Sequence, residues 1–156
     1  MEIERKFLIK EFPDAILKNC VRAEIEQYYL DFGSEELPEK RIRKATQNGD
    51  SEYFYTEKSS GDLCREEEEY EISEYSYKRL KELAISPTVE KTRYYLSIDG
   101  FLIETDVYGG ALKGLIVAEI EFPSTEASES FTPPSWFGEE ITYDKKYKNK
   151  NLAKLI

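Results

Sequence analysis

Like-charged residues separated by one position are the feature of this sequence that most directly suggests chemistry. In a β-strand, residues i and i+2 point to the same face, so each such pair presents two like charges side by side. The acidic pairs are Glu2 and Glu4, Glu67 and Glu69, Glu104 and Asp106, and Glu119 and Glu121. The basic pairs are Arg41 and Arg43, and Lys91 and Arg93, while Lys6 shares the face of Glu2 and Glu4.

Segregation of the two signs into different strands favours a functional explanation over a solvated sheet surface. Same-face neighbours lie roughly 7 Å apart, and like charges at that distance repel. A solvated face is the simpler explanation for any single strand, but the pattern recurs along the chain. Carboxylate pairs are oxygen ligands for Mg²⁺ or Mn²⁺, and arginine pairs bind phosphate oxygens. The pattern therefore predicts metal-assisted chemistry on a phosphate compound.

The elements that must position these charges are mostly strands. We predict strands over residues 2–9, 21–31, 39–46, 51–58, 64–72, 89–98, 101–108 and 115–122, with Asn48-Gly49 as a hairpin signal. Residues 21–31 could also form a helix, although the adjacent Tyr28 and Tyr29 favour a strand. Short helices are predicted over 13–19, 73–84, 124–131 and part of 144–156. The sequence predicts an α+β fold, with a barrel or strongly curved antiparallel sheet and flanking helices.

Apolar residues alternate with the charges in these strands. Ile3, Phe7, Ile103, Ile120 and Phe122 occupy such interleaved positions. If the sheet closes, the charged face would line a lumen and the helices would cover the apolar face. An unpaired buried ion costs several kcal/mol. We therefore expect a wet lumen that holds ions when the protein functions.

Composition excludes several classes of function. The 156 residues suit one domain over 1–156, and a net charge of −10 argues against binding nucleic acid. The chain has no histidine, which excludes Ser-His-Asp and Cys-His catalysis, and its two cysteines lack a zinc-site spacing. No membrane-spanning or signal segment is expected. We predict a cytoplasmic protein with a small anionic substrate and no membrane partner, either a monomer or a homodimer.

The first strand also carries a family resemblance. Glu2-Ile3-Glu4-Arg5-Lys6 matches the ExExK signature of the CYTH superfamily, also called the triphosphate tunnel metalloenzymes. Further segments resemble that family's tunnel strands in the same order: Arg41-Ile42-Arg43, Lys58, Glu67 and Glu69, 89–94, Glu104 and Asp106, and 118–122. Residues 136–142 and 144–149 resemble the small bacterial members. The resemblance implies an eight-stranded antiparallel β-barrel, or tunnel, with a charged lumen, Mg²⁺ or Mn²⁺, and phosphoryl chemistry on triphosphates.

The resemblance and the charge pattern together predict roles for individual residues. The predicted phosphate-binding residues are Lys6, Arg41, Arg43, Lys58, Lys91 and Arg93. The predicted metal ligands are Glu2, Glu4, Glu119 and Glu121 for one ion, with support for a second from among Glu67, Glu69, Glu104 and Asp106. The predicted catalytic set is Glu4, Lys6, Arg43, Lys91 and Lys146. Lys145 or Lys146 would assist proton transfer, or else belong to a solvated helix face. Tyr29 could face the lumen or pack, Trp136 is assigned to packing, and Arg5 has no expected catalytic role.

The predicted reaction is hydrolysis of inorganic tripolyphosphate to diphosphate and phosphate. One alternative is a class IV-type adenylate cyclase, which would convert ATP to cyclic AMP and pyrophosphate; the short chain leaves little sequence for recognising adenine. Another is a thiamine triphosphatase, which would favour an aromatic residue against the thiazolium cation. A non-catalytic polyphosphate-binding module is the alternative outside the enzymes, although it would gain nothing from so many carboxylates.

Overall fold

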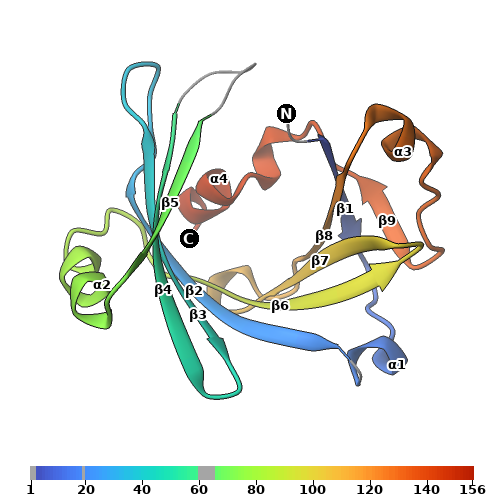
Figure 1. Cartoon of the computed structure of the whole chain (residues 1–156), viewed down its shortest axis with the longest axis horizontal. Helices are drawn as coiled ribbons and strands as arrows, with labels where there is room; N and C mark the ends of the chain where they lie inside the picture. Colours follow the sequence, from blue (N-terminus) through green and yellow to red (C-terminus); the bar gives the residue numbers. More distant parts are fainter. Residues whose placement is uncertain (1–2, 19, 60–65) are drawn as a thin grey trace. The chain divides into compact units, whose positions relative to one another are not determined.

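The computed structural model of the chain describes residues 3–18, 20–59 and 66–156 (Figure 1). They divide into two compact units: residues 1–23 and 91–147 form the first, and residues 24–90 and 148–156 form the second. The described residues contain nine strands, five mainly in the first unit and four mainly in the second, and the pairings within each unit are antiparallel. The expected single domain over 1–156 stays a prediction.

Strands dominate both units, and the helices are short. The strands are β1 (Ile3–Ile9), β2 (Val21–Asp31), β3 (Glu39–Gln47), β4 (Asp50–Lys58), β5 (Glu67–Ile72), β6 (Val89–Ile98), β7 (Phe101–Tyr108), β8 (Ile116–Phe122) and β9 (Phe137–Glu140). The α-helices are α1 (Asp14–Leu17), α2 (Glu74–Lys81), α3 (Thr125–Ser130) and α4 (Asn149–Lys154), and the 3₁₀ turns are η1 (Gly110–Leu112) and η2 (Lys145–Tyr147). None of the helices in the described ranges is both long and apolar enough to cross a membrane.

The first unit is built on strands in the order β6-β7-β8-β1-β9. β6 and β7 form a hairpin through Asp99-Gly100, where both residues have positive φ angles of 52° and 81°. This is the two-residue turn that matches the natural twist of paired strands. β1 pairs with β8 on one side and with β9 on the other, although both strands are distant from it in the sequence.

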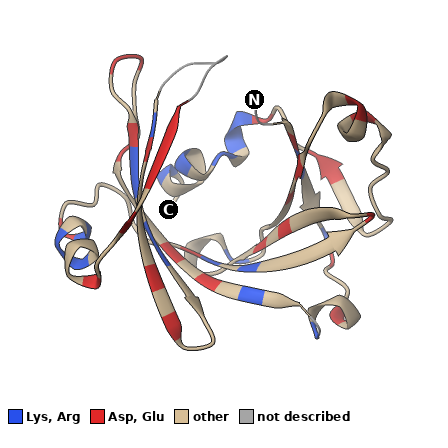
Figure 2. Cartoon of the chain, in the orientation of Figure 1, with Lys and Arg blue, Asp and Glu red and all other residues tan. Residues whose placement is uncertain are grey.

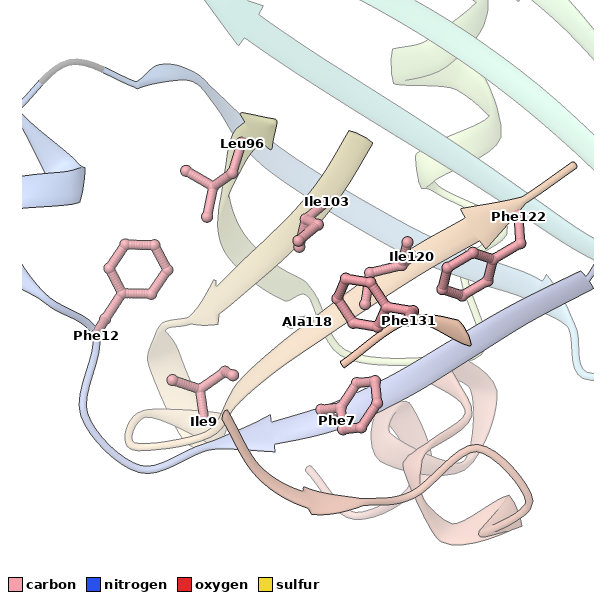
Figure 3. Packing of buried hydrophobic residues seen from close by; sticks show 9 residues of the cluster. All are labelled: Phe7, Ile9, Phe12, Leu96, Ile103, Ala118, Ile120, Phe122 and Phe131. Atoms are coloured by element: carbon pink, nitrogen blue, oxygen red, sulfur yellow. The ribbon is translucent and has the colours of Figure 1, made fainter. Parts of the chain in front are cut away.

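The core of the first unit lies on the apolar face of these strands. Its buried members come from β1, β6, β7, β8 and the segments beside them: Phe7, Ile9, Phe12, Leu96, Ile103, Ala118, Ile120, Phe122 and Phe131 (Figure 3). Ile16 and Leu17 of α1 and Ala127 of α3 pack against this cluster. The prediction that short helices cover the apolar face is therefore confirmed for this unit.

The second unit contains strands in the order β5-β4-β3-β2. The predicted hairpin is confirmed, with Asn48 and Gly49 at φ angles of 50° and 83° between β3 and β4. The core on one face is formed by Tyr28, Ile42 and Tyr77, and Leu80 of α2 packs against it. Residues 21–31 are a strand, as the adjacent tyrosines indicate.

The strand number of the sequence prediction is wrong. All eight predicted strands are present, but β9 is a ninth, and it pairs with the edge of β1. Four residues with a glycine in second position give too short and too weak a pattern to be recognised as a strand. The predicted closure into a barrel stays a prediction.

Helix lengths also differ from expectation. α2 ends at Lys81 rather than at residue 84, and Leu83, which helical spacing assigns to the packed face, is 66% exposed. Without burial of that side chain, little packing energy favours another helical turn. The C-terminal segment contains η2 and α4, so only part of 144–156 is α-helical. The predicted residues 64 and 65 of the fifth strand lie outside the described residues.

The close approach of β9 to β1 gives a test of this packing. A Cβ atom at Gly138 would lie 2.8 Å from the carbonyl oxygen of Leu8, whereas one at Gly109 would meet nothing within 4 Å. We expect Gly138→Ala to lower the free energy of unfolding by about 1–3 kcal/mol, because backbone atoms must move apart. Gly109→Ala, the matched control, should be nearly neutral. Urea denaturation followed by circular dichroism measures both, and equal stability of the two variants would contradict the register of β9.

Candidate active site

The charged residues of the first unit lie on the sheet face opposite its core. The backbone register places Glu4 across from Glu121 and Lys6 across from Glu119. On the other side of β8, Glu119 lies across from Glu104. Residues directly opposite in an antiparallel pair share a face. The side-by-side placement expected from the alternation is therefore present.

A compact ion cluster connects β6 and β7 on this face. The ammonium of Lys91 lies 3.0 Å from the Asp106 carboxylate, and the Lys91 side chain is only 1% exposed. The Arg93 guanidinium donates from Nε to the same carboxylate at 2.8 Å and contacts Glu104 through Nη1 at 3.2 Å. One carboxylate thus holds both cations of the basic pair in fixed positions.

The ionisation of this cluster follows from its contacts. Burial raises the pKa of Asp106, but Lys91 and Arg93 outweigh that effect and lower the pKa to about 2. Burial lowers the pKa of Arg93, but the hydrogen bonds and charge of Asp106 reverse the direction and raise it. Asp106 and Arg93 are therefore both charged at neutral pH.

The remaining carboxylates lie beside a cavity of about 350 Å³. Glu104, Glu119 and Glu121 line it together with Leu102, Phe122 and Pro123. Burial raises the pKa of Glu104 despite the opposing charge of Arg93, and neighbouring Glu119 adds to the increase. Burial also acts to raise the pKa of Glu119, but a hydrogen bond with Glu4 and the charge of Lys6 lower it overall. Lys6 contacts Glu119 at 3.7 Å.

These carboxylates have the donor chemistry that a hard divalent cation requires. Each offers oxygen ligands, and the lining of the cavity brings three of them to one place. In the described ranges, no three acidic or cysteine side chains are grouped tightly enough to hold a metal ion. Glu2, the fourth predicted ligand of the first ion, lies outside the described residues. The donor set fits Mg²⁺ or Mn²⁺ if the glutamate side chains turn inward.

The second unit has its own charged face, on β2, β3, β4 and β5. Arg41 lies across from Tyr29, and Arg43 lies across from Gln27. The guanidinium of Arg43 contacts Glu69 at 3.1 Å and lies over the ring of Phe54. Tyr29 is 1% exposed and shares the face of Arg41, and burial is the main cause that raises its pKa.

Buried donor atoms without an acceptor among the described residues occur on this face, including atoms of Arg41 and Gln27. Arg41 is 8% exposed and Gln27 is 1% exposed, and within the described residues neither the Nε of Arg41 nor the Nε2 of Gln27 has a hydrogen-bond partner. Buried polar groups normally find a partner. Sequence reasoning missed Gln27, although its position two residues before Tyr29 places it on the same face of β2.

Other predicted site residues lie at the ends of strands, on β5 or in the exposed turn η2. Lys58 and Glu67 lie across from each other at the ends of β4 and β5. Figure 2 shows β5 as a mostly acidic strand, and Glu67 and Glu69 belong to it. Lys146 is exposed in η2, with its ammonium over the ring of Tyr147. Lys145 is exposed beside it.

Trp136 contributes to packing, as expected, and Arg5 has its partners away from the charged face. The Arg5 guanidinium contacts Glu140 at 2.8 Å, donates to the carbonyl oxygen of Ser128, and lies over the ring of Phe7. These partners are on the core side of β1, away from Lys6. Trp136 packs against Phe12 and Phe137 in the core of the first unit.

A sheet face that carries carboxylates and basic groups together has the chemistry to bind a multivalent anion and a cation. The CYTH domain family matches residues 1–154, and the chain belongs to that family. An inorganic triphosphatase of Nitrosomonas europaea is 45% identical over 153 residues, which cover 97% of this chain and 96% of that protein. An inorganic triphosphatase of Acetivibrio thermocellus is 35% identical over 98% of this chain and 93% of its own length.

A solved structure agrees with these relatives. The crystal structure of the inorganic triphosphatase NE1496 superimposes with a TM-score of 0.75 and 41% identity, covering 98% of this chain and 94% of that one. The resemblance inferred from ExExK and the alternating pairs is therefore confirmed at the level of the family.

The ion cluster of Lys91, Arg93 and Asp106 leads to a prediction about pH. The folded pKa of about 2 lies below the value of about 3.9 for an unfolded aspartate. The ionised carboxylate therefore stabilises the fold above pH about 4, and this contribution is lost as the pH falls toward 2. Asp106→Asn removes the carboxylate that contacts both the buried Lys91 and Arg93, so we expect it to lower the free energy of unfolding at pH 7 by about 3–5 kcal/mol.

The pH series supplies the sharper part of this test. The difference in free energy of unfolding between wild type and Asp106→Asn, measured with urea, should shrink by about 2–3 kcal/mol from pH 4 to pH 2. Asp50→Asn, at an exposed position beside the β3–β4 turn, is the control and should follow the wild type throughout. A constant difference between wild type and Asp106→Asn across this range would show that the carboxylate is not held ionised by the two cations.

Proposed function

We propose that this chain hydrolyses a linear triphosphate, inorganic tripolyphosphate above all, to diphosphate and phosphate in a metal-dependent reaction. The observation that carries the proposal is the common face of Glu4, Lys6, Glu104 and Glu119 with the Lys91–Arg93 pair. The relatives named inorganic triphosphatases, at 45% and 35% identity over nearly the whole chain, support the substrate. The triphosphate tunnel enzymes of the CYTH family are metal-dependent.

The basic groups of the first unit would bind the phosphate chain. Lys6, Lys91 and Arg93 carry positive charge on the same face as the carboxylates. Their role is to hold the triphosphate in line with an attacking water and to stabilise the charge that moves onto the leaving diphosphate. The new bond joins the water oxygen to a terminal phosphorus atom, and the anhydride bond to the diphosphate breaks.

The second unit would contribute phosphate-binding arginines. Arg41 is buried, and its Nε has no hydrogen-bond partner in the described part of the chain, which supports an anionic ligand as its partner. Arg43 is held by Glu69 and by the ring of Phe54, so its guanidinium is already oriented. Lys58, at the end of β4, would bind phosphate in a more exposed position. Support of a second metal ion by Glu67 or Glu69 stays a prediction.

Carboxylates of the first unit would hold the metal. We assign Glu4, Glu119 and Glu121 to the first ion, with Glu2 as predicted from the sequence, and Glu104 to a supporting position. A bound Mg²⁺ or Mn²⁺ supplies charge neutralisation at the phosphate oxygens and lowers the pKa of a bound water. Which of the two metals is used stays a prediction.

We revise the predicted role of Asp106. Its carboxylate is already occupied by Lys91 and Arg93, at 3.0 and 2.8 Å. A metal ligand at this position would have to give up those contacts and leave the 1% exposed Lys91 side chain without its counter-ion. We therefore propose that Asp106 positions the basic pair and does not ligate the metal.

Several sequence predictions remain open to experiment. Proton transfer by Lys146, whose ammonium lies over the ring of Tyr147, is one of them. The cytoplasmic location and the choice between monomer and homodimer are others. Trp136 is not available as the aromatic residue that a thiamine triphosphatase would place against the thiazolium cation, because its ring packs in the core against Phe12.

A panel of phosphate compounds tests the proposed reaction. Purified protein with Mg²⁺ or Mn²⁺ should release phosphate and diphosphate from tripolyphosphate, and chelation by EDTA should abolish the release. Pyrophosphate, ATP, thiamine triphosphate and long polyphosphate complete the panel. Pyrophosphate and cyclic AMP from ATP would support the cyclase alternative instead, and metal-independent binding without any product would support the binding module. Absence of phosphate release from tripolyphosphate with both metals would refute the proposal.

Two substitutions test the site within the active protein. Arg43→Ala and Glu4→Gln should each lower kcat/KM for tripolyphosphate by about 100-fold or more, because each removes a charge that faces the reacting phosphate or its metal. The matched controls are Arg79→Ala and Glu74→Gln on the exposed helix α2, which make the same chemical changes and should keep full activity. Melting temperatures should show that all four variants are folded. Wild-type kinetics in both site variants would remove these residues from the proposed site.

A further inference from the structure

Gln27 is a buried polar residue that no role proposed above uses. It lies on β2 in the second unit and is 1% exposed. The register places it directly across from Arg43, one pair along from Tyr29 and Arg41. Its side chain therefore belongs to the charged face of this unit and not to the core formed by Tyr28, Ile42 and Tyr77 on the opposite face.

The amide group of Gln27 has a donor without an acceptor. Its Nε2 atom is buried and makes no hydrogen bond to any described residue. An unsatisfied buried donor destabilises a fold, because water has been removed and nothing replaces it. A glutamine retained at such a position needs an acceptor that binds there.

The neighbours of Gln27 on this face are poor acceptors. Arg41 and Arg43, on the adjacent strand, are themselves donors. Glu69, a carboxylate on this face, already accepts from Arg43 at 3.1 Å and from Thr56 at 3.4 Å. In the other direction along β2 the next residue on the face is Ile25, which pairs with Ala45 and offers no polar side-chain atom.

This arrangement favours an anion that accepts from several donors at once. A phosphoryl group has oxygen atoms with several lone pairs, so it can accept from a guanidinium and an amide together. The amide adds a directed hydrogen bond beside Arg43 without adding charge. In the pairing of β2 with β3, the next pair on this face is Ile25 with Ala45, so Gln27 and Arg43 are the last polar pair between these two strands in that direction.

We propose that Gln27 is a substrate-binding residue, whose Nε2 donates to an oxygen of the phosphoryl group bound by Arg43. This assignment rests on the proposed triphosphatase function and adds to it a neutral hydrogen-bond donor that the charge pattern could not indicate. The contact is made in the bound ground state and in the transition state alike, so it contributes to affinity and hardly to kcat.

The test compares substrate binding with stability. Gln27→Met keeps the length of the side chain and removes the amide, so KM for tripolyphosphate should rise by about 10- to 100-fold while kcat changes little. The melting temperature without ligand should stay level or rise, because the variant no longer buries an unsatisfied donor. Gln47→Met makes the same change at an exposed position at the end of β3 and should leave KM and kcat unchanged.

A binding measurement separates this proposal from the reaction itself. Tripolyphosphate titrated calorimetrically in EDTA should bind wild type and Gln47→Met equally and Gln27→Met more weakly by the same 10- to 100-fold. Gln27→Glu, of nearly equal shape, should bind more weakly still, because it turns a carboxylate toward the phosphate, and it keeps the test available if Gln27→Met does not fold. If wild type binds tripolyphosphate but does not hydrolyse it with Mg²⁺ or Mn²⁺, the proposed reaction is refuted. The affinities of the Gln27 variants then decide the role of Gln27.

Two results would overturn the proposed role of Gln27. A lowered melting temperature with unchanged KM and unchanged tripolyphosphate affinity in the Gln27 variants would show that the amide serves the fold alone. Absence of tripolyphosphate binding by the wild type, with and without metal, would overturn both the reaction and the role of Gln27.

Discussion

The two-residue period of the β-strand is the constraint on which the rest of this structure depends. In β1 it turns Lys6 toward the charged face and Phe7 into the core, although the two are neighbours in the chain. A shift of one residue in the register would bury the charges of a whole strand and expose its apolar side chains. The core of the first unit therefore fixes the site as firmly as it fixes the fold, because each apolar residue that packs behind the sheet sets the direction of the charged residues beside it.

Charge compensation across strands makes such a face possible. The sequence segregates the signs by strand, so that β6 carries Lys91 and Arg93 and β7 carries Glu104 and Asp106. Pairing of β6 with β7 then brings opposite charges together, with Arg93 across from Asp106. Burial of an ion is costly unless it is paired and hydrogen-bonded. The same contacts that make the buried Lys91 tolerable also hold it ready for an anionic ligand, so stability and binding depend on one carboxylate.

The sequence predicts what depends on local pattern and misses what depends on particular partners. The eight main strands, the Asn48-Gly49 turn and the common face of the charged pairs follow from alternation and turn chemistry, which are visible within a few residues. β9 was missed because its four residues become a strand only by pairing with β1. Glu104 and Asp106, two positions apart, look alike in the sequence, and the contact of Lys91 with Asp106 is what supports the proposal of a different role for Asp106. Gln27 carries no charge and therefore gave no signal in a pattern built on charges.

The balance of charge on the first unit's face explains why a metal and an anionic substrate belong to the same site. Its acidic members are Glu4, Glu104, Asp106, Glu119 and Glu121, and its basic members are Lys6, Lys91 and Arg93. Among the described residues of this face, five carboxylates against three cations leave an excess of negative charge, which repels a triphosphate and attracts a divalent cation. A divalent ion offsets that excess, after which the three basic groups can act on the phosphate oxygens. Under the proposed function, the carboxylates that appear unsuited to an anion-binding surface would thus strengthen triphosphate binding once a divalent ion is bound.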